Sequence, residues 1–163
     1  MKKLLIIRHG DAPLNNLLND HNRPLSKQGV LDTQLIGRYI LEKKIVPDLI
    51  ISSSAKRTIS TAENIIYGGN LENKYFVNSS IYGGDSSFLL YLLSEQKNIY
   101  KTICLIGHEP HFSTFICNMT NNNKITFKTA NLAVLDIDIV KWEHIEYKKG
   151  ILSLHITPNE LKL

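Results

Sequence analysis

The chain has 163 residues, of which 43% are hydrophobic and 21% are charged. This length and composition predict one globular domain spanning residues 1–163 and argue against a disordered or fibrous protein. The formal net charge is +4 and the pI is near 9.0, but the lysines are spread along the chain without a basic run interleaved with aromatic residues. We therefore expect no nucleic-acid partner, and a mild positive field that favours an anionic substrate.

The sequence contains no pattern typical of export or membrane insertion. Met1-Lys2-Lys3 has the charge of a signal peptide, but only four apolar residues follow before Arg8, whereas an export signal needs roughly 7–15. No run approaches the about 18 apolar residues of a membrane span. We expect a cytoplasmic protein with no membrane partner, in which reduced thiols are favoured over a disulfide between Cys104 and Cys117.

Three apolar runs with the character of buried strands each lead to basic side chains. They span residues 4–7, 48–52 and 102–107. The first is four consecutive branched apolar residues, the pattern of a short strand buried on both faces of a sheet. If the three runs are neighbouring parallel strands, their carboxyl ends meet at the edge where an open α/β sheet binds its ligand. The basic groups that would converge there are Arg8, His9, Arg57 and His108.

The segments between these strands predict helices. Ser26 is a suitable N-cap for a helix over about residues 27–44, whose expected core face is Leu31, Leu35, Ile36, Tyr39 and Ile40. A second helix is predicted from about 55 to 66, followed by a turn at 67–70. Arg57 then lies in a first helical turn, where free backbone N–H groups favour an anion.

The rest of the chain completes an α/β pattern and then changes character. A short strand is predicted at 75–77, a helix with an apolar face over 88–93, and a helix over 110–119. Residues 132–139 alternate as Leu, Val and so on, residues 151–156 do likewise, and the two segments predict a terminal hairpin at one sheet edge. We expect packing or surface roles for Trp142, His144 and His155. Three α/β units with right-handed crossovers predict a three-layer α/β/α sandwich with a mainly parallel sheet.

The ordered motifs of the first two thirds of the chain, roughly, resemble the histidine phosphatase superfamily, and within it the SixA-type phosphohistidine phosphatases. They are Arg8-His9-Gly10-Asp11-Ala12, Arg23-Pro24-Leu25-Ser26 with Gly29, Ser52-Ser53-Ser54-Ala55-Lys56-Arg57-Thr58, Gly84-Asp85 and Ile106-Gly107-His108-Glu109-Pro110. Their joint occurrence is far more specific than an isolated Arg-His-Gly. The resemblance implies the phosphoglycerate-mutase-like fold, with an antiparallel edge to the sheet.

The resemblance also assigns chemical roles. His9 would be the nucleophile that forms a covalent phosphohistidine, since a neutral imidazole attacks phosphorus readily near pH 7. An acceptor such as the Gly10 carbonyl would hold its other ring nitrogen as N–H. Planar guanidinium groups match the oxygens of a transferring phosphoryl group, so Arg8 and Arg57 would clamp it, with His108 as a further donor. The arginines supply positive charge, so no metal or cofactor is expected.

Loop 11–25, which follows the first strand, is predicted to form a wall of the site. It is rich in Asn, Asp and Pro, the composition of a loop. Within it, Arg23 belongs to the Arg-Pro-Leu motif and could reach the rim of the phosphate site, so we assign it a supporting role in substrate binding. For His21 we expect an ordinary solvated loop histidine.

The sequence lacks an obvious acid for the leaving group. Superfamily members acting on sugar phosphates use a glutamate after the fourth strand, but no Glu occurs between Glu72 and Glu95. Asp11 and Asp85 are the carboxylates expected near the substrate. A P–N bond leaves as imidazole, which accepts a proton at neutral pH and needs less help than an alkoxide. The absence therefore favours a phosphoramidate substrate.

Short connections without an inserted lid predict an open site, which suits a phosphorylated side chain presented on a protein. The interpretation favoured by the sequence is a phosphatase for phosphohistidine on a signalling or phosphotransfer protein. Two alternatives remain open at this point. One is a phosphatase of the same mechanism acting on small phosphomonoesters, and the other is a phosphate-binding module without catalysis.

Overall fold

Six strands form one sheet in the order β3-β2-β4-β1-β5-β6 in the computed structural model, which describes residues 1–162. Strands β1 to β4 run parallel, and β5 and β6 add an antiparallel edge. Both the mainly parallel sheet and the terminal hairpin are therefore confirmed. The strands are β1 (Lys2–Arg8), β2 (Leu49–Ser52), β3 (Tyr75–Val77), β4 (Thr102–Gly107), β5 (Leu132–Ile137) and β6 (Gly150–Ile156).

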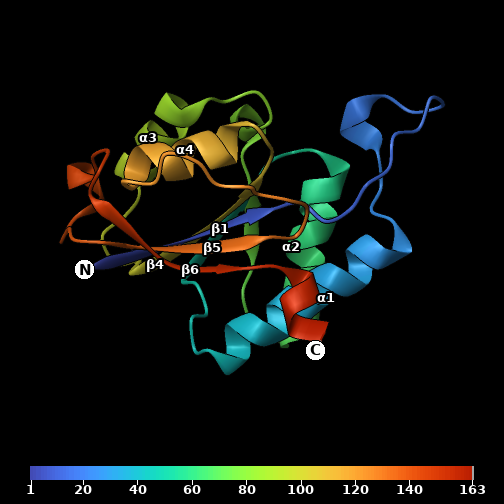
Figure 1. Cartoon of the computed structure of the whole chain (residues 1–163), viewed down its shortest axis with the longest axis horizontal. Helices are drawn as coiled ribbons and strands as arrows, with labels where there is room; N and C mark the ends of the chain where they lie inside the picture. The colour runs from blue at the N-terminus through green and yellow to red at the C-terminus, as the bar shows by residue number, and fades with distance from the viewer. Residues whose placement is uncertain (163) are drawn as a thin grey trace.

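Helices cover both faces of this sheet and make the predicted three layers (Figure 1). One face carries α1 and α2, and the other carries α3 and α4. None of the helices in residues 1–162 has the length and apolar character needed to cross a lipid bilayer. The helices are α1 (Lys27–Glu42), α2 (Lys56–Gly69), α3 (Ser86–Ser94) and α4 (His111–Met119).

Strand β1 separates two hydrophobic cores. Leu4 and Ile6 point into the core beneath α3 and α4, whereas Leu5 and Ile7 point into the core beneath α1 and α2. Successive side chains of a strand face opposite sides, so four apolar residues in a row are what a strand buried on both faces requires. Cys104 of β4 lies in the second core as a free thiol.

The strand order brings the predicted basic residues to one edge of the sheet. In the central strands, Arg8 of β1 pairs in register with Gly107 of β4, and Ser52 of β2 pairs with Ile106 of β4. The three strands are thus parallel neighbours that end at the same level. The residues that follow the three strands therefore lie close together at one edge of the sheet.

Helices α1 and α2 pack through small residues, which corrects the predicted core face of α1. Ile36 and Ile40 are buried as expected, but Leu31 is 58% exposed. A Cβ atom at Gly37 would lie 2.1 Å from the carbonyl oxygen of Ile65, so the two backbones approach more closely than any larger residue allows. The buried face of α1 therefore includes small residues and leaves out Leu31. It consists of Gly29, Thr33, Ile36, Gly37 and Ile40.

The predicted turn at 67–70 is wrong, because α2 continues through Gly69. A Cβ atom at Gly68 would lie 2.2 Å from the carbonyl oxygen of Gln34 in α1. Gly68 and Gly69 are therefore contact points between α2 and α1. The chain turns one residue later, at Asn70, which adopts a left-handed conformation with φ 47° and caps the helix.

The Gly37→Ala substitution tests this contact. We expect it to lower the free energy of unfolding by about 1–3 kcal/mol, the usual cost of overpacking, despite the about 1 kcal/mol that alanine gains over glycine in a helix. Gly83→Ala is the control, because an added Cβ there meets nothing within 4 Å. Urea denaturation of both variants measures the difference, and equal stability of the two would contradict the packing argument.

Candidate active site

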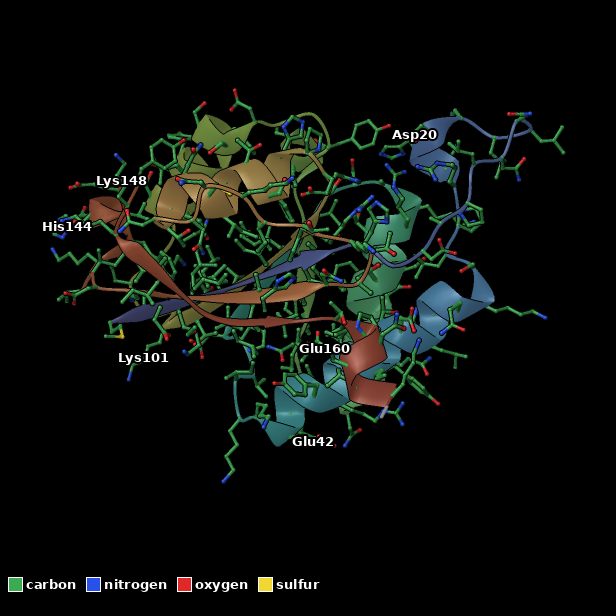
Figure 2. The ribbon with its side chains drawn as sticks, viewed as in Figure 1. Asp20, Glu42, Lys101, His144, Lys148 and Glu160 are labelled. Carbon is green, nitrogen blue, oxygen red and sulfur yellow. The ribbon has the colours of Figure 1, made fainter. Side chains whose placement is uncertain are left out.

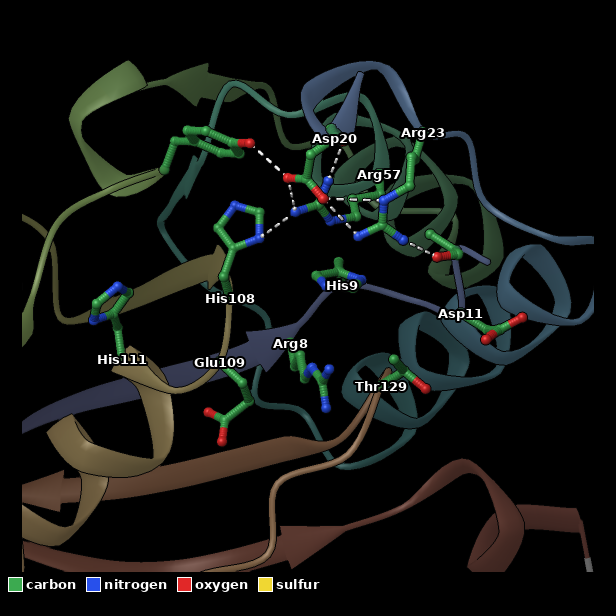
Figure 3. Close-up of a pocket in the computed structure, with 12 residues that line it drawn as sticks. Arg8, His9, Asp11, Asp20, Arg23, Arg57, His108, Glu109, His111 and Thr129 are labelled. Atoms are coloured by element: carbon green, nitrogen blue, oxygen red, sulfur yellow. Dashed lines mark hydrogen bonds and ion pairs between the residues drawn. The ribbon is translucent and has the colours of Figure 1, made fainter. Parts of the chain in front are cut away.

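A cavity of about 600 Å³ lies where β1 and β4 end. The structure brings six of the seven predicted site residues to its wall, namely Arg8, His9, Asp11, Arg23, Arg57 and His108 (Figure 3). Among the twelve lining residues, only Ala12 and Thr129 lack a titratable side chain. The predicted wall formed by loop 11–25 is confirmed by Asp11, Ala12 and Arg23, together with Asp20, which the sequence analysis did not single out.

His9 follows β1 directly and is held in one tautomer. Its Nδ1 lies 2.7 Å from the carbonyl oxygen of Gly10, so Nδ1 carries the proton and donates it to that carbonyl. Burial, followed by the positive charges of Arg57 and Arg8, lowers the pKa of His9 to about 4. At neutral pH the ring is therefore uncharged, and its Nε2 atom carries a lone pair.

His108 follows β4 and is also neutral, because burial and the nearby Arg57 lower its pKa to about 3. Its Nδ1 lies 3.3 Å from Nη2 of Arg57, which can only donate, so Nδ1 is an acceptor. Its Nε2 then carries the proton and donates to Oγ of Ser53 at 2.7 Å. The expected donor role of His108 toward substrate differs from this arrangement, since the single N–H group of the ring points to Ser53.

Arg8 and Arg57 each keep one buried donor without a partner. Arg8 donates from Nη1 to the carbonyl of Phe127 at 3.1 Å, and Arg57 donates from Nη1 to the carbonyl of Asp20 at 2.7 Å. The Nε atoms of both arginines are buried and have no hydrogen-bond partner in the described part of the chain. An unsatisfied buried donor costs about 1–3 kcal/mol, and more when charged. Both arginines line the same cavity, and two guanidinium groups on one cavity wall indicate an anion site.

Asp20 is the main residue that sequence reasoning missed. Its carboxylate accepts hydrogen bonds from Arg57 Nη2 at 3.0 Å, from Arg23 Nη2 at 2.9 Å and from the Tyr82 hydroxyl at 2.5 Å. The hydrogen bond from Tyr82, followed by those from the two arginines, holds the pKa of Asp20 well below its usual range despite partial burial. The only signal available was its place in a loop already expected to border the site.

The same loop is tied to the protein by His21, for which the prediction of an ordinary solvated residue is wrong. Its Nε2 lies 2.9 Å from Oγ of Ser54, and its ring meets Tyr82 edge-on with centroids 5.0 Å apart. Arg23 also donates to the backbone carbonyl of Ala12. The loop is therefore fastened at several points around the cavity mouth.

The comparisons with known proteins agree with this geometry. Residues 4–75 match the histidine phosphatase superfamily (branch 1). An uncharacterized chloroplastic protein of Arabidopsis thaliana is 28% identical over 152 residues, which are 87% of this chain and 69% of that protein.

Solved structures show the same fold. The structure of the protein histidine phosphatase SixA complexed with tungstate has a TM-score of 0.85 at 22% identity and covers 98% of this chain and 99% of its own. Phosphoserine phosphatase from Entamoeba histolytica, complexed with 3-phosphoglyceric acid, has a TM-score of 0.70 at 16% identity and covers 99% of this chain and 100% of its own. The predicted phosphoglycerate-mutase-like fold is thus confirmed.

The carboxylates near the cavity differ from those expected. Asp85 lies outside the cavity wall, because its carboxylate caps α3 by accepting from the Phe88 N–H at 3.0 Å and the Ser87 hydroxyl at 2.7 Å. Glu109 lines the cavity instead, with Oε1 accepting from the Ser113 N–H at 2.7 Å. Glu109 is part of the motif ending in Pro110 and could have been considered from the sequence. Asp11 is on the wall, where it accepts from the Ser26 hydroxyl at 2.6 Å.

No cluster of three or more His, Cys, Asp or Glu side chains within residues 1–162 is arranged to hold a metal ion. The superfamily match ends at residue 75 and therefore includes Arg8, His9 and Arg57, whereas His108 is placed at the site by the fold. The arrangement can bind an anion between two guanidinium groups and present a neutral imidazole to it.

The depressed pKa values predict how stability depends on pH. In the unfolded chain histidines take up protons near pH 6.5, whereas His9 and His108 stay neutral in the folded protein down to about pH 4 and 3. Because the unfolded state binds more protons, we expect the free energy of unfolding to fall as pH is lowered from about 6.5 to 5. The slope is at most about 1.4 kcal/mol per pH unit for each histidine.

Urea denaturation across this pH range measures the slope. His108→Gln should make it shallower, while the same change at the exposed His144 should leave it as in the wild type. Identical slopes for wild type and His108→Gln would show that His108 is protonated equally in both states.

Proposed function

We propose that this chain is a phosphohistidine phosphatase that transfers the phosphoryl group to Nε2 of His9 and then to water. The observation that carries the proposal is a neutral histidine with an available Nε2 lone pair, on the wall of the same cavity as the guanidinium groups of Arg8 and Arg57. Planar guanidinium groups match the geometry and charge of a phosphoryl group. The structural similarity to the protein histidine phosphatase SixA supports the same substrate class.

The first step forms a bond from His9 Nε2 to phosphorus while the P–N bond of the substrate breaks. The electron pair of that bond goes to the departing imidazole, which takes a proton from solvent. Arg8 and Arg57 offset the negative charge on the phosphoryl oxygens. The Gly10 carbonyl accepts from His9 Nδ1–H and stabilises the positive charge that develops on the ring. In the second step the oxygen of water bonds to phosphorus while the P–Nε2 bond breaks and returns its electron pair to Nε2 of His9. The attacking water loses a proton to solvent, and inorganic phosphate is released.

The carboxylates of the site support a nitrogen leaving group. Asp20 is held ionised by Tyr82 and the two arginines, so it is a poor proton donor. Asp85 is engaged at the start of α3 and lies outside the cavity wall. An alkoxide leaving group needs a proton from a positioned acid, whereas imidazole accepts one readily at neutral pH. The site therefore suits a phosphoramidate better than an alkyl phosphate.

One observation favours a second candidate function, hydrolysis of small phosphomonoesters by the same mechanism. Glu109 lines the cavity, and only its Oε1 atom accepts a hydrogen bond. If Glu109 protonates an alkoxide leaving group, this chain would act on phosphomonoesters, the substrate class of the structurally similar phosphoserine phosphatase. The relative rates on the two kinds of substrate decide between the candidates.

Phosphate release from a histidine-phosphorylated phosphotransfer protein, compared with alkyl phosphomonoesters such as phosphoserine, tests the proposal. We expect the phosphohistidine protein to react at least about tenfold faster, because its leaving group needs no acid. His9→Ala should lower turnover by at least about 1000-fold and abolish an acid-labile phosphoenzyme. His144→Ala, a surface histidine, is the control.

Faster turnover of phosphoserine than of the phosphohistidine protein would favour the second candidate. Retained turnover in His9→Ala would show that another group is the nucleophile. Phosphate binding without turnover by the wild type would leave only a binding module.

We also propose that catalysis needs no metal, because the two arginines supply the positive charge that the phosphoryl group requires. Dialysis against a chelator should therefore leave phosphohistidine turnover unchanged. Tungstate, a phosphate analogue, should inhibit competitively by occupying the anion site. Loss of activity on chelation that a divalent cation restores would contradict this proposal.

A further inference from the structure

The loop between β1 and α1 carries three exposed leucines beside the cavity. Leu14, Leu17 and Leu18 are 86%, 92% and 42% exposed. No residue from Ala12 to Asn19 is charged, although the cavity wall at both ends of this segment is strongly charged. We call these three side chains the leucine knob. An apolar group of this kind on the rim of a polar site is typical of an interaction surface.

The knob has a defined conformation and a fixed position relative to the cavity. Asn15 closes a turn by accepting from the Leu18 N–H on its carbonyl at 3.1 Å and from the Leu17 N–H on its side chain at 2.9 Å. Behind the turn, Arg23 donates to the carbonyl of Ala12, and Asp20 binds Arg57. The segment projects from the body of the molecule (Figure 1), with Asp20 at its base (Figure 2).

We propose that the leucine knob is a docking surface for the phosphorylated protein substrate and packs against an apolar patch beside its phosphohistidine. This inference rests on the proposed function. The residues that flank the knob, Ala12 and Asp20, are themselves part of the cavity wall. A macromolecule that places a side chain in the cavity must therefore lie against the adjoining rim, whereas a small metabolite inside the cavity does not need the knob.

The composition of the rim argues for a protein partner with both apolar and acidic character. Protein interfaces combine an apolar centre with a polar, charged surround. Here the leucines supply the apolar contact, the charged side chains of the cavity wall supply the polar surround, and the net charge of +4 favours a partner that is acidic overall. The knob thus adds affinity for the protein that carries the phosphohistidine, without taking part in the chemistry.

The double variant Leu14→Ser/Leu17→Ser tests the proposal. We expect kcat/KM for a histidine-phosphorylated phosphotransfer protein to fall about tenfold, as the loss of interface anchors predicts. Turnover of p-nitrophenyl phosphate, which needs only the cavity, should stay within about twofold of the wild type. Both substitutions are at exposed positions, so an unchanged melting temperature verifies the fold.

A matched control is Ile99→Ser/Val140→Ser. These residues are 76% and 79% exposed, but they lie at the other end of the sheet, before β4 begins and after β5 ends. This variant should behave as the wild type toward both substrates. A similar loss in the control would mean that general surface hydrophobicity, and not the knob, affects the assay.

Other results would overturn the proposal. Unchanged kcat/KM for the phosphorylated protein in the knob variant would show that the leucines do not contact it. If sedimentation shows a wild-type dimer that the knob variant lacks, or binding to lipid vesicles that it lacks, with protein turnover unaffected, the occupant is a second copy or a membrane. Failure of the wild type to dephosphorylate the protein would instead overturn the proposed function, which the wild-type assay alone reveals.

Discussion

The burial of Arg57 and the partial burial of Arg8 beside two histidines form the constraint on which the site depends. Arg57 and both imidazoles are almost fully removed from solvent, and the guanidinium groups stay charged. Burial and, after it, the positive charge of Arg57 make each imidazole more stable without a proton, which is why the pKa values of both histidines are depressed. One arrangement therefore both favours an anion and keeps His9, the nucleophile that we propose, in its neutral form.

Asp20 offsets part of the positive charge of the arginines and fastens the loop between β1 and α1 to the body of the protein. The loop has the composition of a solvated connection, yet Asp20 reaches Arg57, Arg23 and Tyr82, and His21 reaches Ser54. A carboxylate between two guanidinium groups lowers the cost of burying them in the free protein. It also fixes the loop at the rim, so the wall of the cavity and the surface beside it are positioned by the same ion pairs that balance the site.

The sequence was sufficient wherever one local pattern determined the outcome. Four apolar residues followed by Arg8 and His9 predicted a central buried strand ending at a site, and Ser26 capped its helix as expected. The sequence was insufficient where two backbones approach closely, because a glycine such as Gly68 is equally compatible with a turn and with a close contact between helices. The sequence also did not identify the carboxylate that binds the arginines. Asp85 and Asp20 both lie in loop-like sequence, and only the tertiary structure decides which of them meets Arg57.

In the reaction that we propose, the burial and positive charge that lower the pKa of His9 also act on the leaving group. A substrate imidazole inside the cavity experiences the same positive field as His9, so its protonation is disfavoured there. The proton that completes its departure is therefore taken most readily as the imidazole withdraws toward solvent. This favours a leaving group that stays attached to a protein resting on the rim, because withdrawal then requires no escape from an enclosed pocket. If the proposal holds, the leucine knob on the rim and the two arginines of the cavity thus serve the same reaction.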